Sequence, residues 1–195
     1  DLELDAKRYT AAQNAYSEAI ELNPDFFYPH LQSGLASEKQ GALTKAISRL
    51  NRSIELLPTP QAYNALGNIA QRQGDTDQAR EYFAAASKGQ GEAGQTALNS
   101  LLKIDLSRNP GAYIAIRYGR NEVSALQIEV ANKAPRAFMN VTLSIRYIDQ
   151  NGQARTSQRR ISRLNANEAR LINTGLISPQ GNTQISVLSA TLIES

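Results

Sequence analysis

The sequence predicts an α+β protein of two domains, an all-α array of helical repeats followed by a small all-β antiparallel sandwich. Three observations predict this architecture. Small and bulky side chains recur every 33 or 34 positions in the first half, whereas apolar and polar residues alternate every second position in the second half. The net charge also changes, from −2 over residues 1–110 to +5 over residues 111–195. Because the helix-stopping tripeptide Asn109-Pro110-Gly111 lies at this change, we expect a helical domain over residues 1–108 and a sandwich over residues 112–195.

The composition excludes several kinds of site. The 195 residues include no cysteine and one histidine, His30. Disulfides, thiolate catalysis, cysteine-ligated zinc and sites that need two histidines are therefore excluded. No apolar run approaches the roughly 18 residues of a membrane helix. We expect His30 to be a packing or surface residue, and we expect no catalytic residue, metal ligand or cofactor in this chain.

The helical half is organised by a repeat whose units are marked by Pro24 and Pro58, which lie 34 positions apart and stop the second helix of each unit. Each unit is expected to consist of two antiparallel helices. Small residues let these helices approach closely, and large residues fill the space between neighbouring pairs. The small positions are Ala19, Gly34, Ala46, Gly67, Ala79 and Ala86, and the large ones are Tyr16, Leu50, Leu66 and Phe83.

The other helix ends follow from the residues between the helices. Gly41 and Gly74 are expected to end the first helix of their units, because glycine adopts the left-handed backbone conformation at little cost. Asp75 is expected to cap the helix that follows it, and Thr44 is the corresponding residue of the earlier unit. An apolar stripe predicts one more helix, over residues 94–106, that caps the array.

These positions resemble a known repeat. The third copy reads Tyr63-x-x-Leu66-Gly67, then Gly74, then Ala79-x-x-x-Phe83-x-x-Ala86. This spacing resembles a tetratricopeptide repeat, and residues 9–24 resemble the second half of one. The middle copy departs from the family pattern at His30, Ser33 and Ser37, where an aromatic residue, a leucine and a tyrosine are usual. The resemblance covers about residues 1–90 and implies a superhelix of stacked helix pairs.

The same resemblance implies where the chain starts and what it binds. Asp1 stands at the ninth position of its repeat, so we expect an incomplete first unit and a chain that is part of a longer protein. In such arrays the first helix of each unit lines a concave groove that holds an extended peptide or a partner helix. By register, the groove residues are Tyr28, Leu31, Leu35, Glu38, Gln61, Asn64, Asn68 and Gln71.

Four of these groove residues, on a single helix, are amides, which offer donors and acceptors to a peptide backbone without charge. The basic residues with which some family members clamp a C-terminal carboxylate are absent from these positions. A solvated polar face without a ligand is the alternative interpretation.

The second half of the chain has the period of two that is typical of strands with one buried face. The expected strands cover residues 113–118, 126–131, 141–147, 154–164, 169–176 and 183–193. Asp149-Gln150-Asn151-Gly152 predicts a hairpin, because Asn-Gly tolerates positive φ. Residues 165–168 are expected to form another turn.

This half resembles the small β-sandwich modules of the FxLYD type. The resembling stretch is Leu126-x-Ile128-x-Val130-x-Asn132, followed by Val141-x-Leu143-x-Ile145-x-Tyr147-x-Asp149-x-x-Gly152. The resemblance implies an accessory module without catalysis and a location in the bacterial periplasm or cell envelope. The composition by itself does not distinguish that location from the cytoplasm.

Two further motifs suggest other ligands. Residues 89–94 spell GxGxxG, but a helix rather than a strand is expected before them, so we interpret them as a glycine-rich break and not as a nucleotide site. Arg155, Arg159, Arg160 and Arg163 form a basic strand. This strand is either an anion surface or an edge strand that charge protects from aggregation. Nucleic acid is disfavoured, because no aromatic residues alternate with the arginines.

The main functional hypothesis is a non-enzymatic interaction scaffold that binds a protein or peptide in the concave groove. The alternative is the C-terminal accessory region of a larger envelope enzyme, such as a zinc peptidase that carries tetratricopeptide repeats. The sequence leaves a homo-oligomer open and does not identify the partner.

Overall fold

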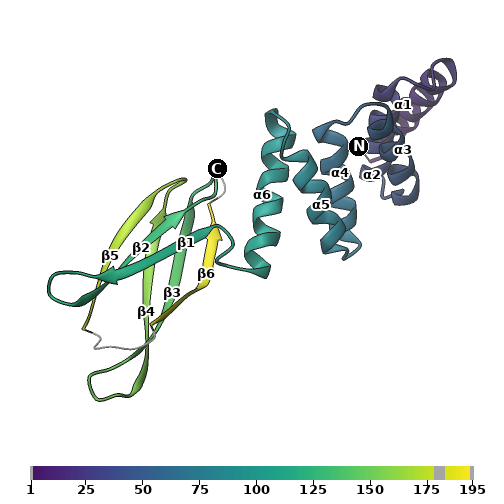
Figure 1. The fold of residues 1–195 in the computed structure, drawn as a ribbon. Coiled ribbons are helices and arrows are strands. Elements are labelled where there is room, and N and C mark those ends of the chain that lie inside the picture. The colour runs from purple at the N-terminus through teal and green to yellow at the C-terminus, as the bar shows by residue number, and fades with distance from the viewer. Residues whose placement is uncertain (1, 178–182, 194–195) are drawn as a thin grey trace. The chain divides into compact units, whose positions relative to one another are not determined.

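The computed structural model describes residues 2–177 and 183–193, and the side chains of residues 9–176 and 183–193. Within these residues, six helices are followed by six strands (Figure 1), as predicted for an α+β protein of two parts. Two compact units, Asp1–Leu101 and Leu102–Ser195, divide the chain within its last helix. The helices are α1 (Leu2–Leu22), α2 (Phe27–Lys39), α3 (Leu43–Leu56), α4 (Pro60–Arg72), α5 (Thr76–Ala86) and α6 (Gly91–Arg108). The strands are β1 (Ile114–Arg120), β2 (Ala125–Asn132), β3 (Phe138–Ile148), β4 (Ala154–Leu164), β5 (Ala169–Ile177) and β6 (Gln184–Leu192).

The helix ends agree with most of the sequence predictions. Gly41 and Gly74, with φ of 75° and 82°, follow α2 and α4. The side chain of Asp75 caps α5 by accepting the backbone N–H of Gln78 at 3.0 Å. The prediction for Thr44 was wrong, because α3 begins at Leu43, two residues earlier than a cap at Thr44 requires, and its N-cap, Ala42, has no side chain that can accept.

The first helix also differs from expectation. The family register predicted a short remnant of a first helix, a turn and then a second helix, whereas α1 runs unbroken from Leu2 to Leu22. Its 21 residues contain no glycine or proline. Nothing in this segment therefore favours the left-handed residue that separates the two helices in the later units.

Helix pairs α2–α3 and α4–α5 meet where glycine faces a large side chain. A Cβ atom added to Gly34 would lie 2.7 Å from Cγ of Leu50, and one added to Gly67 would lie 2.6 Å from Cε1 of Phe83. Leu50 and Phe83 are fully buried. The predicted division of repeat positions into small and large residues is therefore confirmed at both helix pairs.

The polar residues of the middle unit form a buried network with α1. Gln13, on α1, donates to the backbone carbonyl of Ser33 at 3.1 Å and to Oγ of Ser37 at 3.0 Å. Ser33 donates back to Oε1 of Gln13 at 3.0 Å. His30 is 3% exposed and its Nε2 lies 3.0 Å from the carbonyl oxygen of Pro24, so it is a packing residue as predicted. Hydrogen bonds therefore replace the aromatic and aliphatic contacts usual at these positions.

The strands form two three-stranded antiparallel sheets, in the orders β1-β2-β5 and β4-β3-β6. The alternating apolar residues of β2 and β3 make the core: Leu126, Ile128, Val130, Val141, Leu143 and Ile145 are each at most 4% exposed. The Asn-Gly hairpin joins β3 to β4, with Gly152 at φ 77° as predicted. The edge strand expected over residues 113–118 is β1.

Asn132 closes one end of the sandwich. Its side chain is 1% exposed, and Nδ2 donates to the carbonyl oxygens of Arg136 at 2.7 Å and Asn165 at 2.9 Å. Its Oδ1 accepts the backbone N–H of Ala134 at 2.9 Å. One amide group therefore holds together the β2–β3 loop and the β4–β5 turn.

Candidate peptide-binding groove

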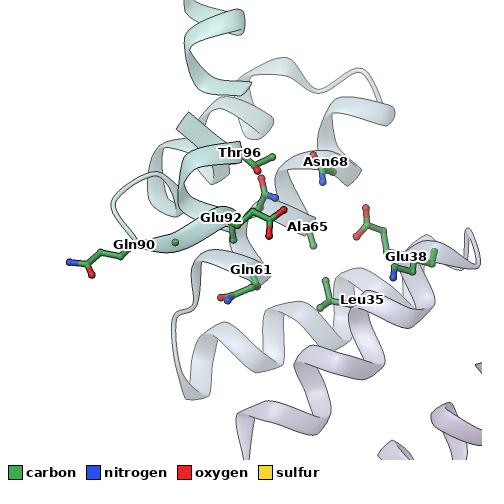
Figure 2. A pocket seen from close by; sticks show the side chains of 12 residues that line it. Leu35, Glu38, Gln61, Ala65, Asn68, Gln90, Glu92 and Thr96 are labelled. Carbon is green, nitrogen blue, oxygen red and sulfur yellow. The ribbon is translucent and has the colours of Figure 1, made fainter. Parts of the chain in front are cut away.

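A groove of about 660 Å³ lies within the helical unit, between α2, α4 and the start of α6 (Figure 2). It is lined by Leu35, Glu38, Lys39, Gln61, Asn64, Ala65, Asn68, Gln90, Gly91, Glu92, Ala93 and Thr96. The amide residues on α4 are spaced three or four positions apart, which places them along one face of the helix.

The structure brings together some of the predicted groove residues and separates others. Leu35, Glu38, Gln61, Asn64 and Asn68 line the groove.

Three predicted groove residues lie elsewhere. Leu31 is 5% exposed and belongs to the core between the helices, because a leucine gains more from burial there than at a polar surface. Tyr28 packs near the rings of Phe26 and Phe27, with centroids 6.3 Å away. Gln71 is exposed and lies outside this groove. The groove therefore contains three of the four predicted residues on α4 and the two predicted residues nearest the end of α2, whereas Tyr28, Leu31 and Gln71 lie outside its lining.

The contribution of α6 was missed from the sequence. Its first turns supply Glu92, Ala93 and Thr96 to the groove, so it forms a wall as well as an end of the array. The available signal was its place in the chain, because it follows α5 where the first helix of a further repeat would stand.

The glycine-rich segment before α6 allows the chain to turn closely from α5 into α6, which forms this wall of the groove. A Cβ atom on Gly89 would lie 2.0 Å from Cγ of Pro60, and one on Gly94 would lie 2.0 Å from the carbonyl oxygen of Gly89. Gly91 has a φ of 84°. The preceding element is α5, a helix, so the strand that a dinucleotide site requires is missing there. The glycines thus serve a tight connection.

The charged residues of the groove are held in different ways. Glu38, whose side chain is 15% exposed, pairs through Oε1 with Arg72, whose side chain is 50% exposed. Burial raises the pKa of the Glu38 carboxyl above its ordinary value, and the opposing attraction of Arg72 and Lys39 is smaller. Glu38 and Glu92 extend into the groove from opposite sides (Figure 2).

We expect the stability difference between the wild type and Glu38→Gln to depend on pH. Because the folded pKa of Glu38 is raised, its stabilising contribution is complete below the unfolded pKa and is lost as pH rises through the folded pKa. The wild type should therefore gain stability relative to Glu38→Gln on acidification from about pH 8 to about pH 4. Urea unfolding of both proteins across this range measures the difference, and a difference that is constant or shrinks on acidification would contradict the assignment.

Asn64, which lines the groove, has a hydrogen-bonding atom without a described partner. Its Oδ1 is buried and has no partner among the residues that the structure describes. A buried amide oxygen without a partner is costly, and a donor from a ligand would remove that cost once the side chain rotates toward it.

The four arginines of β4 do not form one surface. Successive side chains of a strand point to opposite faces, so Arg155, Arg159 and Arg163 share one face and Arg160 lies on the other. Nη2 of Arg159 donates to the carbonyl oxygen of Thr174, at 2.5 Å, and so joins the two sheets.

The other arginines of β4 also have local partners. Arg155 pairs with Asp149 at 2.9 Å, Arg160 donates to Oδ1 of Asn140 at 2.5 Å, and Arg163 donates to Oδ1 of Asn165 at 2.9 Å. Because β4 is an edge strand, this arrangement favours charge protection of the edge over a common anion site.

Two negative findings concern only the described part of the chain. No three His, Cys, Asp or Glu side chains come together there as a metal site would require. None of the helices described has the length and hydropathy of a membrane span.

Comparison with known proteins agrees with the geometry of the helical half. Residues 1–59 and residues 60–88 each match a family model described as tetratricopeptide repeat. The helical half carries tetratricopeptide repeats. The chain is also similar, with 27% identity over 97 residues, to the TPR repeat-containing protein MJ1428 of Methanocaldococcus jannaschii. That match covers 50% of this chain and 17% of the relative, so the chain spans well under two thirds of its length.

A comparison with solved structures gives a match that covers nearly the whole chain. This is the alkylpurine DNA glycosylase AlkC of Pseudomonas fluorescens bound to DNA that contains an abasic site analog. The match has 14% identity, covers 98% of this chain and 66% of that one, and has a TM-score of 0.26. A score this low supports no conclusion about this chain.

Proposed function

We propose that this chain is a non-enzymatic interaction scaffold whose groove holds an extended segment of a partner protein. The observation that carries the proposal is the row of amides on α4, Gln61, Asn64 and Asn68, inside a groove that also has apolar lining. Tetratricopeptide repeats are consistent with protein partners.

The chemistry of the groove suits a peptide backbone. Each side-chain amide offers two N–H donors and an oxygen acceptor, so it can pair with both the carbonyl and the N–H of an extended segment. Leu35, Ala65 and Ala93 supply apolar surface between these polar groups. The groove volume of about 660 Å³ is within the range of roughly 300–1,000 Å³ that is typical of ligand-binding pockets. A short stretch of a peptide has a comparable size.

Selection from a phage-displayed peptide library on the whole chain tests the proposal. Selected peptides should bind the Asn64→Leu/Asn68→Leu variant about thirtyfold more weakly, because two amides that each contribute about 1 kcal/mol are replaced by apolar side chains of similar size. Gln71→Leu is the matched control, since it makes the same kind of change on the same helix outside the groove. Equal affinity of the double variant and the wild type, with both correctly folded, would move the binding site elsewhere.

We further propose that the sandwich is an accessory module of the FxLYD type and that the protein works in a bacterial envelope. Asn132 at the end of β2, with its bonds to two loops, supports the first part. Fractionation of cells of the source organism tests the second part. Recovery in the cytoplasmic fraction alone would refute it.

A further inference from the structure

Resting on the proposed peptide-binding function, we propose that the groove selects a segment that carries a lysine or arginine side chain, whose cation lies between Glu38 and Glu92. The proposal names the charge of the partner at one position. It follows from the placement of the carboxylates, from the atoms that remain available on them and from the surfaces beside them.

The two carboxylates come from different helices on opposite sides of the groove. Glu38 lies in the last turn of α2, and Glu92 lies in the first turn of α6 (Figure 2). Both side chains extend toward the space that a bound segment would occupy. A cation at that point would interact favourably with both carboxylates, whereas a carboxylate would be repelled by both.

The cations already present leave these carboxylates only partly compensated. Arg72 contacts Oε1 of Glu38, which leaves Oε2 as an acceptor for a second donor. Glu92 makes no ion pair with any residue that the structure describes. Arg72 does not line the groove and Lys39 is the basic residue that does, so the lining itself holds two carboxylates and one ammonium group.

The burial of Glu38 adds a reason for a cationic partner. A carboxylate that is 15% exposed has lost much of its hydration, and the raised pKa of Glu38 reflects that loss. A charged donor from the partner would restore part of the lost solvation, and hydrogen bonds to charged groups are stronger than those between neutral groups.

The surfaces around the carboxylates fit the rest of a long basic side chain. Leu35, Ala65 and Ala93 offer apolar contact for the methylene stem of lysine or arginine, which is commonly buried while the charged end stays at a polar site. Asn64 and Asn68 lie close enough in sequence to share one helix face and can bind the backbone on either side of that residue.

Peptide pools with one fixed central residue test the proposal. Four pools of otherwise random ten-residue peptides carry Lys, Arg, Gln or Glu at the centre, and fluorescence anisotropy measures their binding to the whole chain. The wild type should bind the Lys and Arg pools about tenfold more tightly than the Glu pool, with the Gln pool between them. Raising the salt concentration should weaken the binding of the Lys and Arg pools more than the binding of the Gln pool.

Substitution of one carboxylate identifies the site. Glu92→Gln should remove most of the preference for the Lys pool over the Gln pool. Glu81→Gln is the control, because Glu81 is an exposed glutamate on α5 that does not line the groove. Circular dichroism confirms that both variants remain folded.

The outcomes separate this inference from the proposed function. Equal binding of all pools, or preference for the Glu pool, would overturn the charge selection while leaving peptide binding intact. A preference for Lys that survives Glu92→Gln would also overturn it. Failure of every pool to bind, together with failure of the peptide selection described above, would overturn the proposed function itself.

Discussion

Replacing Phe83 with alanine is expected to lower the free energy of unfolding of the helical unit by about 3–5 kcal/mol. Phe83 is fully buried, and its ring faces the backbone of Gly67 on the neighbouring helix of the same pair. Removal of the ring loses its burial and leaves a cavity that the helices cannot close completely. Urea unfolding followed by circular dichroism at 222 nm measures this change.

Gly67→Ala should have effects of opposite sign with and without that ring. In the wild type, the new Cβ atom would lie 2.6 Å from Cε1 of Phe83, so overpacking should cost about 1–3 kcal/mol. In the Phe83→Ala background the collision is gone, and the helix propensity of alanine should stabilise α4 by about 1 kcal/mol. Additive effects of the two substitutions would contradict the direct contact between Gly67 and Phe83.

Asn132→Ala is expected to destabilise the sandwich by about 3–5 kcal/mol, the larger end of single-substitution effects. The change removes the partner of the part-buried carbonyl oxygens of Arg136 and Asn165 and of the buried N–H of Ala134. Each such group costs about 1–3 kcal/mol. Native-state hydrogen exchange of the whole chain measures the loss in the strands separately from the helices.

Asn132→Asp sharpens this test. At neutral pH its second carboxylate oxygen would face the carbonyl oxygens that Nδ2 now serves, so it should cost at least as much as alanine. In acid, the protonated carboxyl can donate one bond, and part of the loss should be recovered. Asn173→Ala is the control: Asn173 is exposed on β5, and we expect a change within about 0.5 kcal/mol. Equal effects at positions 132 and 173 would contradict the role of Asn132.

The small and large repeat positions could be predicted because their residue sizes are visible in the sequence and must be complementary where two helices pack closely. Gly67 and Phe83 differ in size in a complementary way, and the same relation recurs at Gly34 and Leu50. Strand limits could be predicted for a similar reason, since the alternation in β2 and β3 allows one register with the apolar residues inside.

Features that depend on which elements meet could not be predicted from local pattern. Gln13 reads as an ordinary polar residue of a helix, and its burial is explained only when Ser33 and Ser37 are seen opposite it. Glu92 is a groove residue because α4 and α6 line the same groove, and no local pattern in the sequence shows that these two helices meet.

At two places a local signal in the sequence pointed away from the prediction made from the family register or from the charge pattern. Leu31 was assigned to the groove by family register against its own apolar character, and it lies in the core. The arginines of β4 were treated as one patch although neighbouring positions 159 and 160 of a strand must face opposite ways. In both cases elementary chemistry at the residue was the better guide.

Solution NMR of the whole isotope-labelled chain tests the central claim most directly, because the side-chain amide signals of Asn64 and Asn68 report contact with a ligand themselves. On titration with a peptide selected for binding, we expect these signals and the backbone amides at the start of α6 to shift most. Saturable binding that leaves the amide signals of both residues unchanged, with shifts confined to residues 102–195, would contradict the claim that the groove is the binding site.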